Sequence, residues 1–171
     1  MKKRFFFYLV IGLALVTTGL FFVFSATEGA HLRLDGKILK VRSVPIPGSD
    51  DSLVVVDFRV ANPSDVRFVI SSAKILLSPA GAAPLEGTGV SKPEIDKLFE
   101  YQKLLGPKYN DVLSLQDRVN PHANVDRMLG ATFALTGAAI DARKNLQLRL
   151  EDVDGTVAEI SESGAGATTR K

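Results

Sequence analysis

The stretch VVVDFRVANPSDVRFVI, residues 54–70, decides the fold because it holds two strand patterns and a stop between them. In the first pattern the even-numbered residues 54–60 share one face, and the odd-numbered residues 55–61 share the other. This period of two is typical of a strand with one face on a core and one face in water. Asn62-Pro63 then ends the strand, since proline donates no N–H to a ladder and asparagine suits the first position of a turn. The stretch predicts a hairpin, and a binding loop at Asn62-Pro63 is the alternative.

The same period recurs along the chain. Apolar residues alternate with polar or small ones over three further segments, 113–116, 129–135 and 146–151. A last strand, over about 156–160, follows Asp154-Gly155, a dipeptide that favours a hairpin turn because both residues tolerate a positive φ. The alternation changes phase at Ser71-Ser72 and across Gly36, which predicts a bulge or bend near each position.

One segment has the period of a helix instead. Ser91 and Glu94 have the spacing of a capping box, and Gly106-Pro107 closes the pattern. Between them runs an apolar stripe with charged residues on the other side. The stripe consists of Ile95, Leu98 and Phe99, and Gln102 continues it at the same spacing. The pattern predicts a crossover helix over about 92–105 that covers one edge or end of the sheets.

The elements together indicate the fold class. About seven short strands, one crossover helix and many turn dipeptides predict a mostly β protein, an antiparallel immunoglobulin-like β-sandwich over residues 31–160. Two facing sheets bury the apolar faces that a single strand cannot bury alone. Residues 161–171, SESGAGATTRK, are small and polar, and we expect a disordered tail there.

The N-terminal segment has the length and composition of a membrane span. Residues 5–24, FFFYLVIGLALVTTGLFFVF, carry no charge, and a helix of that length crosses about 30 Å of hydrocarbon. The basic flank at residues 1–4 is expected to stay cytoplasmic, so the chain after the linker at 25–30 is extracytoplasmic. These features predict a single-pass signal-anchor helix in the cell (inner) membrane, with the lipid bilayer as its partner. A signal peptide cleaved after Ser25 or Ala26 is the alternative.

Charge and cysteine content exclude some classes of function. The chain has 21 basic and 19 acidic residues, and three of the basic ones lie in the N-terminal flank. The predicted extracytoplasmic domain is therefore close to neutral, which argues against nucleic acid as a partner. The chain has no cysteine, so it forms no disulfide and carries no thiolate ligand or lipid-modified cysteine.

The residues around Asn62-Pro63 also resemble a known family. A strand, Asn-Pro and a second strand, here VVVDFRVANPSDVRFVI, are similar to the LEA14 or water-stress (WHy) type of β-sandwich, in which Asn-Pro-Asn separates the two strands. Ser64 stands where that pattern has its second asparagine. The similarity in motif covers residues 54–70, and the similarity in the general arrangement of strands covers residues 31–160. The resemblance implies a non-enzymatic sandwich linked to stress protection or envelope upkeep, in a single-pass bacterial envelope protein.

No group of residues predicts catalysis, a cofactor or a tightly held metal. His31 and His122 have no second histidine at metal-ligand spacing, and we expect both on the surface. The chain lacks a Gly-x-Ser-x-Gly elbow and a phosphate loop. Asp152 and Asp154 lie in an Asp-x-Asp-Gly sequence, which favours a hairpin turn and leaves a weak calcium site as the alternative. We therefore name no catalytic, cofactor-binding or metal-binding residue.

The sequence therefore predicts a non-catalytic binding or scaffolding module of the cell envelope. We expect an envelope protein to contact the exposed side of the 92–105 helix or the loop Lys108-Tyr109-Asn110. A stress-protective LEA14-like protein that acts on membranes or unfolding proteins is the alternative. A third hypothesis is an enzyme whose site is assembled in space, which requires a cleft with convergent acids of perturbed pKa.

Overall fold

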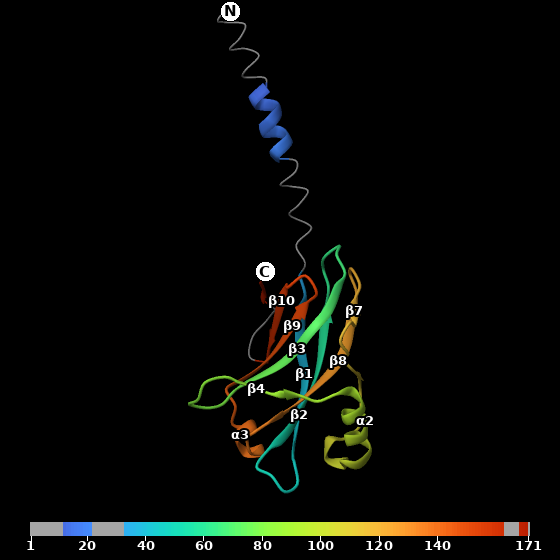
Figure 1. Cartoon of the computed structure of the whole chain (residues 1–171), viewed down its shortest axis with the longest axis vertical. Helices are drawn as coiled ribbons and strands as arrows, with labels where there is room; N and C mark the ends of the chain where they lie inside the picture. Colours follow the sequence, from blue (N-terminus) through green and yellow to red (C-terminus); the bar gives the residue numbers. More distant parts are fainter. Residues whose placement is uncertain (1–11, 22–32, 163–167, 171) are drawn as a thin grey trace, which may run out of the picture.

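The computed structural model describes residues 12–21, 33–162 and 168–170, and it is mostly β (Figure 1). The first sheet contains β1 (Asp35–Pro45), β2 (Ser52–Ala61), β5 (Thr88–Gly89), β6 (Asp111–Val112) and β8 (Asn124–Phe133). The second sheet contains β3 (Phe68–Ser78), β4 (Leu85–Glu86), β7 (Arg118–Val119), β9 (Asn145–Asp152), β10 (Val157–Ser161) and β11 (Thr168–Arg170). The helical elements in 33–162 are α2 (Lys92–Tyr101), the short 3-10 helix η2 (Lys103–Leu105) and α3 (Gly137–Asp141).

The two sheets share one apolar core, and the prediction of a mostly β fold is confirmed. The first sheet has the order β1-β2-β8-β5 with β6 beside β8, and the second has the order β11-β10-β9-β3-β4 with β7 beside β3. Alternate residues of the long strands point into the core, as their period of two predicts. They include Val54, Val56, Phe58, Ile75, Leu77, Leu146, Leu148 and Leu150. The pairings are antiparallel, except that β6 pairs with β8 in parallel.

Strand β2 is buried on both faces over residues 52–58, which corrects the expectation that its odd-numbered face lies in water; Arg59, farther along that face, is exposed as expected. Val55 and Asp57 are 0% and 2% exposed. The reason is that α2 and η2 cross the outer face of the first sheet and pack on it through a second apolar cluster. Its members are Val44, Leu53, Val55, Ile95, Leu105, Val112 and Met128. The domain therefore has a helical layer outside the first sheet, in addition to the two sheets.

The predicted helix over 92–105 is confirmed at its start and is shorter than predicted. Glu94 accepts a hydrogen bond from the Ser91 N–H at 2.9 Å, as in a capping box, and a second one from the Ser91 Oγ–H at 2.6 Å. The α-helix ends at Tyr101, and the remaining turn is the 3-10 helix η2. Gly106 follows with a φ of 69°, in the left-handed region that glycine adopts without strain. The helix covers a face of the first sheet, whereas the sequence predicted that it covers an edge or end.

Asn62-Pro63 connects the two sheets, and the predicted hairpin between its flanking strands is wrong. Strand β2 pairs with β1 and β8, while β3 pairs with β9, β4 and β7. Asn62 is 1% exposed, and its Nδ2 donates to the carbonyls of Val66 at 2.7 Å and Val119 at 3.0 Å. Its Oδ1 accepts from the N–H of Ser64 at 3.1 Å. The local turn chemistry was predicted correctly, but alternation cannot reveal which sheet the next strand joins.

Two of the local predictions about strands are confirmed. The register of β3 against β9 shifts between Ile70 and Ser72, as the phase change at Ser71-Ser72 predicts. Asp154-Gly155 lies in the turn between β9 and β10, where Gly155 has a φ of 87°.

Three other local predictions need correction. The bulge expected near Gly36 lies between Ile38 and Lys40. At Gly36 itself a Cβ would come within 2.4 Å of the Ile160 side chain, so close packing explains this glycine. Residues 113–116 are not a strand, because Gln116 adopts a φ of 69° in a turn after β6. The disordered tail over 161–171 is wrong in part, since Ser161 belongs to β10 and β11 pairs with that strand.

Part of the N-terminal prediction lies outside the described residues. Residues 12–21 are helical, while the rest of the predicted 5–24 span, the 1–4 flank, the 25–30 linker and His31 are not described. Among the residues that the structure does describe, no helix has the length and apolar character needed to cross a bilayer.

We predict that Asn62→Asp lowers the free energy of unfolding by about 3 kcal/mol. The substitution keeps the acceptor for Ser64 but replaces the donor to Val66 and Val119 with a second oxygen. Denaturant unfolding followed by circular dichroism measures the change. The control Asn124→Asp, at an exposed position of β8, should change it by less than about 0.5 kcal/mol. Equal losses of unfolding free energy in the two variants would show that the hydrogen bonds donated by the Asn62 amide do not stabilise the connection between β2 and β3.

Candidate functional site

A buried ion pair lies between the first sheet and its helical cover. Arg42 of β1 is 8% exposed and Asp57 of β2 is 2% exposed, and the Nη2 of Arg42 donates to Oδ2 of Asp57. The other carboxylate oxygen accepts from Nδ2 of Asn110 at 2.9 Å. A buried ion pair is tolerated only where further hydrogen bonds replace the lost water. Asn110 supplies one of these, and the covering segment supplies the others.

The rest of the Arg42 guanidinium holds the end of η2. Its Nη1 donates to the carbonyls of Leu105 at 2.8 Å and Pro107 at 3.0 Å, which lie where a helix leaves carbonyls without internal partners. The guanidinium carbon also lies 4.9 Å from the ring centroid of Phe99 and 5.7 Å from that of Tyr109. One side chain therefore joins two strands, α2, η2 and the following loop.

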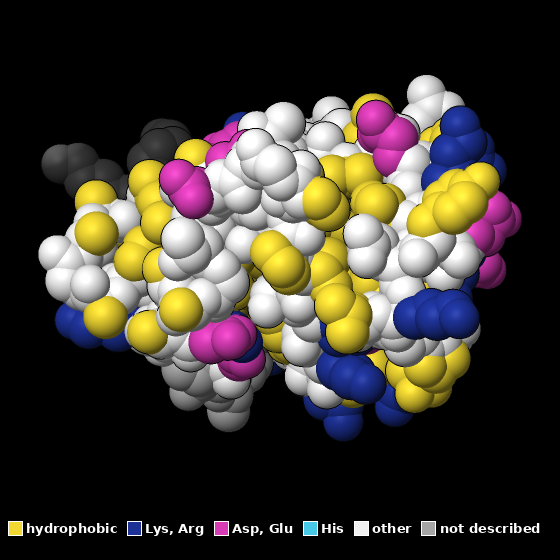
Figure 2. Space-filling model, turned by 90° about the horizontal axis from the view of Figure 1, so that it is seen from below, with side chains coloured by type: hydrophobic (Ala, Val, Ile, Leu, Met, Phe, Trp, Pro, Cys, Tyr) yellow, Lys and Arg dark blue, Asp and Glu magenta, His cyan; other side chains and the backbone are white. Residues whose placement is uncertain are grey.

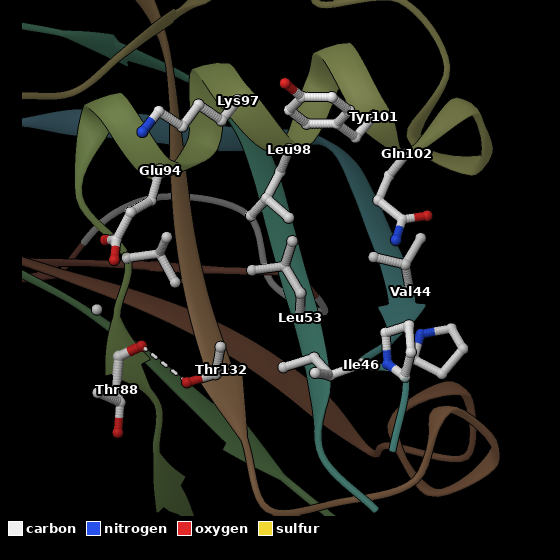
Figure 3. Close-up of a pocket in the computed structure, with 14 residues that line it drawn as sticks. Val44, Ile46, Leu53, Thr88, Glu94, Lys97, Leu98, Tyr101, Gln102 and Thr132 are labelled. Atoms are coloured by element: carbon white, nitrogen blue, oxygen red, sulfur yellow. Dashed lines mark hydrogen bonds between the residues drawn. The ribbon is translucent and has the colours of Figure 1, made fainter. Parts of the chain in front are cut away.

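Beside the ion pair, an apolar groove with a volume of about 560 Å³ opens between α2 and the end of the first sheet (Figure 3). Val44 and Leu53 form its floor, and Leu98 points toward Leu53 from the helix. The segment Pro45-Ile46-Pro47 forms one rim, and Thr88 to Val90 forms another. The volume lies within the range of about 300–1,000 Å³ that is usual for small-molecule sites.

Some polar side chains of the groove make hydrogen bonds to other described residues, and others do not. Thr132 donates to the Thr88 carbonyl at 3.4 Å, and Glu94 is bonded to Ser91 at the helix start. The hydrogen bonds from Ser91 lower the pKa of the Glu94 carboxyl, and the positive charge of Lys97 is a smaller cause in the same direction. A second set of polar side chains makes no hydrogen bond to another described residue. This set is Lys97, Tyr101 and Gln102, all on the groove side of α2.

Large apolar side chains also lie outside the groove on the same helical cover. Leu104 and Tyr109 are 80% and 61% exposed, and Tyr101, which lines the groove, is 79% exposed. Lys40 lies 5.2 Å from the centroid of the Tyr109 ring. Seen from the end of the domain that carries α2 and α3, apolar side chains are gathered across the surface, and several basic side chains lie toward one side (Figure 2). Exposed apolar groups in such numbers are typical of interaction surfaces.

The structure brings together the two surfaces that the sequence proposed for a partner. The 92–105 helix and the loop Lys108-Tyr109-Asn110 both belong to the cover of the first sheet. Asn110 is half-buried and engaged with Asp57, so Lys108 and Tyr109 are the exposed part of that loop. Sequence reasoning missed the groove and the ion pair. The available signals were two prolines around Ile46 at a strand end, and a lone carboxylate, Asp57, among valines.

Asp152 and Asp154 accept backbone hydrogen bonds at the turn of the β9–β10 hairpin. Asp152 is 4% exposed, and its carboxylate accepts from the N–H of Val69, while Asp154 accepts from the N–H of Thr156 at 2.9 Å. Burial, with the nearby Asp154 carboxylate as a smaller cause, raises the pKa of Asp152. Within the described ranges, no three acidic or histidine side chains form a group that could hold a metal ion. The arrangement is that of a hairpin turn, in which each carboxylate accepts a backbone N–H.

The remaining titratable candidates lie apart from the groove. His122 is exposed on the surface, as predicted, and its Nε2 lies 2.9 Å from Oδ1 of Asp65. Glu94 is the single carboxylate among the residues that line the groove. Asp152, with its raised pKa, belongs to the turn beyond β9.

Comparisons with known proteins provide little further information. No protein-family model and no curated protein matches the sequence. A crystal structure of a Bordetella pertussis protein described as ApaA is similar at 12% identity, over 82% of this chain and 89% of that one, with a TM-score of 0.38. A structural-genomics target designated SoR45 is similar at 10% identity, over 82% of this chain and 83% of that one, with a TM-score of 0.34. Similarities at this level support no inference about fold or function.

We predict that Arg42→Met lowers the free energy of unfolding by about 4 kcal/mol, because it leaves Asp57 charged and buried without its partner. The double variant Arg42→Met/Asp57→Leu should lose at least about 2 kcal/mol less than the sum of the two single losses. The exposed pair Lys74–Glu86 is the control, and Lys74→Met should cost less than about 1 kcal/mol. Denaturant unfolding measures all four variants. Additive losses at Arg42 and Asp57 would contradict the coupling.

We also predict a pH dependence that originates at Asp152. Because the pKa of Asp152 is raised in the folded state, the native protein holds this proton more tightly than the unfolded chain does. The resulting stabilisation is complete below the ordinary carboxyl pKa of about 3.9 and is lost as the pH rises through the raised value. Asp152→Asn keeps an acceptor for Val69 and stays neutral. Its free energy of unfolding should therefore rise relative to the wild type between acid and neutral pH, and a constant difference would contradict the prediction.

Proposed function

We propose that this protein is a non-catalytic binding module of the cell envelope, an immunoglobulin-like β-sandwich anchored by residues 5–24 with its domain on the extracytoplasmic side. The groove under α2, together with the exposed side chains of the α2–η2 cover, is its binding face. The observation that carries the proposal is the apolar groove of about 560 Å³, lined on one side by three polar side chains that make no hydrogen bond to another described residue. An apolar pocket with a few convergent polar groups is the usual form of a ligand site.

The described part of the N-terminal segment supports the anchor. Residues 12–21 are helical, and their large apolar side chains are between 52% and 71% exposed. The hydroxyls of Thr17 and Thr18 donate to helix carbonyls one turn back, at 2.8–3.0 Å. A helix that exposes apolar side chains and satisfies its own hydroxyls is suited to an apolar solvent. The cytoplasmic placement of residues 1–4 rests on their positive charge.

We predict that a photo-crosslinking residue at Leu104 or Tyr109 of the full-length protein captures one defined species in native membranes. The same residue at Val153, 65% exposed in the turn between β9 and β10, is the control and should capture none. Capture is read by the mass of the conjugate. Equal capture at all three positions, or none at any, would contradict a binding face on the helical cover.

The same experiment distinguishes the stress-protective alternative. A protective protein contacts many unfolding clients, so it should give a broad set of conjugates that grows on heating. It should also slow the aggregation of a heated client at equimolar ratio. A single conjugate without an effect on aggregation favours the binding module.

A further inference from the structure

We propose that the groove under α2 forms part of a peptide site, in which an extended polypeptide segment pairs with the uncovered edge of β5 and places an uncharged aliphatic side chain in the groove. The proposal rests on the binding module proposed above and names the chemical class of its ligand. It follows from the backbone geometry of β5, which borders the groove through Thr88 and Gly89.

Strand β5 ends the first sheet, and β8 is the single strand in the described part of the chain that pairs with it. Gly89 of β5 stands opposite Ala131 of β8. The N–H of the next residue, Val90, donates to the Gly130 carbonyl at 2.9 Å. In an antiparallel pair, residues that exchange hydrogen bonds with the partner strand alternate with residues that do not. The N–H and C=O of Gly89 therefore point away from β8, toward the outer edge of the sheet.

The edge at Gly89 is accessible to a second chain. Thr88 and Gly89 are exposed, and a Cβ at Gly89 would meet no atom within 4 Å. An uncovered strand edge presents a donor and an acceptor with the spacing of a polypeptide backbone, and an extended peptide can bond both. A hydrocarbon ligand would bond neither. The structure therefore favours a peptide over a purely apolar ligand.

Alternate side chains of a strand added at this edge would point toward the groove. Side chains that stand opposite each other on paired strands lie on the same face of a sheet. Ala131 lies in the core between the two sheets, so Gly89 and the peptide residue opposite it face inward. The neighbouring peptide residues face outward, on the side where Thr88, Val90 and α2 line the groove.

The lining of the groove suits an uncharged aliphatic side chain. Val44, Leu53 and Leu98 present aliphatic carbon to the space (Figure 3). The helix wall carries Glu94 and Lys97, one negative and one positive side chain, so it favours neither an anion nor a cation. In strand addition, main-chain hydrogen bonds supply affinity, and pockets for alternate side chains supply specificity. The edge of β5 and the groove provide these two parts of such a site.

The test uses the full-length protein in lipid nanodiscs and the peptide acetyl-Gly-Thr-Val-Thr-Leu-Thr-Gly-amide as the probe. Titration calorimetry gives the affinity, and hydrogen exchange is followed by mass spectrometry. We expect millimolar or tighter binding that slows exchange in residues 87–90, because the Gly89 N–H becomes bonded. The same peptide with N-methylated threonines cannot donate to the Gly89 carbonyl, and it should bind at least about tenfold more weakly. Unchanged exchange in residues 87–90 at millimolar peptide would overturn the proposal.

Two variants at one position test the strand pairing. Gly89→Pro removes the donor at the edge and should weaken peptide binding at least about tenfold. The variant is expected to fold, because proline is tolerated on an edge strand where its nitrogen faces away from the sheet. Gly89→Ala keeps the N–H, and its Cβ meets no atom within 4 Å, so it is the matched control and should bind within about twofold of the wild type. Equal affinities of the two variants would contradict the pairing.

The outcomes separate this inference from the proposed function. If Leu104 and Tyr109 capture a partner while the peptide does not bind, the binding module stands and the strand addition is wrong. If the N-methylated peptide binds as tightly as its parent, the groove accepts apolar groups without strand pairing, and the inference is overturned. Peptide binding that Gly89→Pro abolishes, without capture at Leu104 or Tyr109, would support the inference and confine the binding face to the groove.

Discussion

The structure depends on the burial of β2 on both faces, with the carboxylate of Asp57 on the outer one. A strand in this position needs a cover, and a charge beneath the cover needs a partner and hydrogen bonds in place of water. Arg42 meets both needs, because its guanidinium bonds the carboxylate on one side and the carbonyls of Leu105 and Pro107 on the other. The cover buries the ion pair, and Arg42 hydrogen-bonds the cover, so we expect each to stabilise the other.

The groove is a consequence of how that cover lies. The η2 end is fixed over Arg42, and Ile95 packs into the apolar cluster on the first sheet. Nearer the strand ends, Val44 and Leu53 pack in the same cluster and also form the floor of the groove, with Leu98 of the helix pointing toward Leu53. Lys97 and Tyr101 of α2 line the same space. A groove with an apolar floor and a helix wall that carries both Glu94 and Lys97 therefore arises from the elements that stabilise the domain.

The crossing at Asn62-Pro63 shows why a motif resemblance carries little information on ligands. The asparagine that resembles the LEA14 pattern is fully engaged by the chain itself, through Ser64, Val66 and Val119. Its chemistry explains how a strand leaves one sheet and enters the other. Any sandwich that needs such a crossing can use the same residues, and their presence does not indicate a common partner.

The sequence by itself determined the local features. The period of two located most of β2 and β9 and half of β8, Ser91 and Glu94 located the start of α2, and Asp154-Gly155 located a hairpin. Each of these depends on neighbours in the chain, through backbone geometry and short-range hydrogen bonds. The tertiary structure alone decided that β3 joins the second sheet, that α2 covers a face, that Asp57 is buried against Arg42 and that Lys97 borders a cavity. These features depend on contacts between residues far apart in sequence. An alternating pattern indicates that one face of a strand is buried, but it does not indicate which element covers that face.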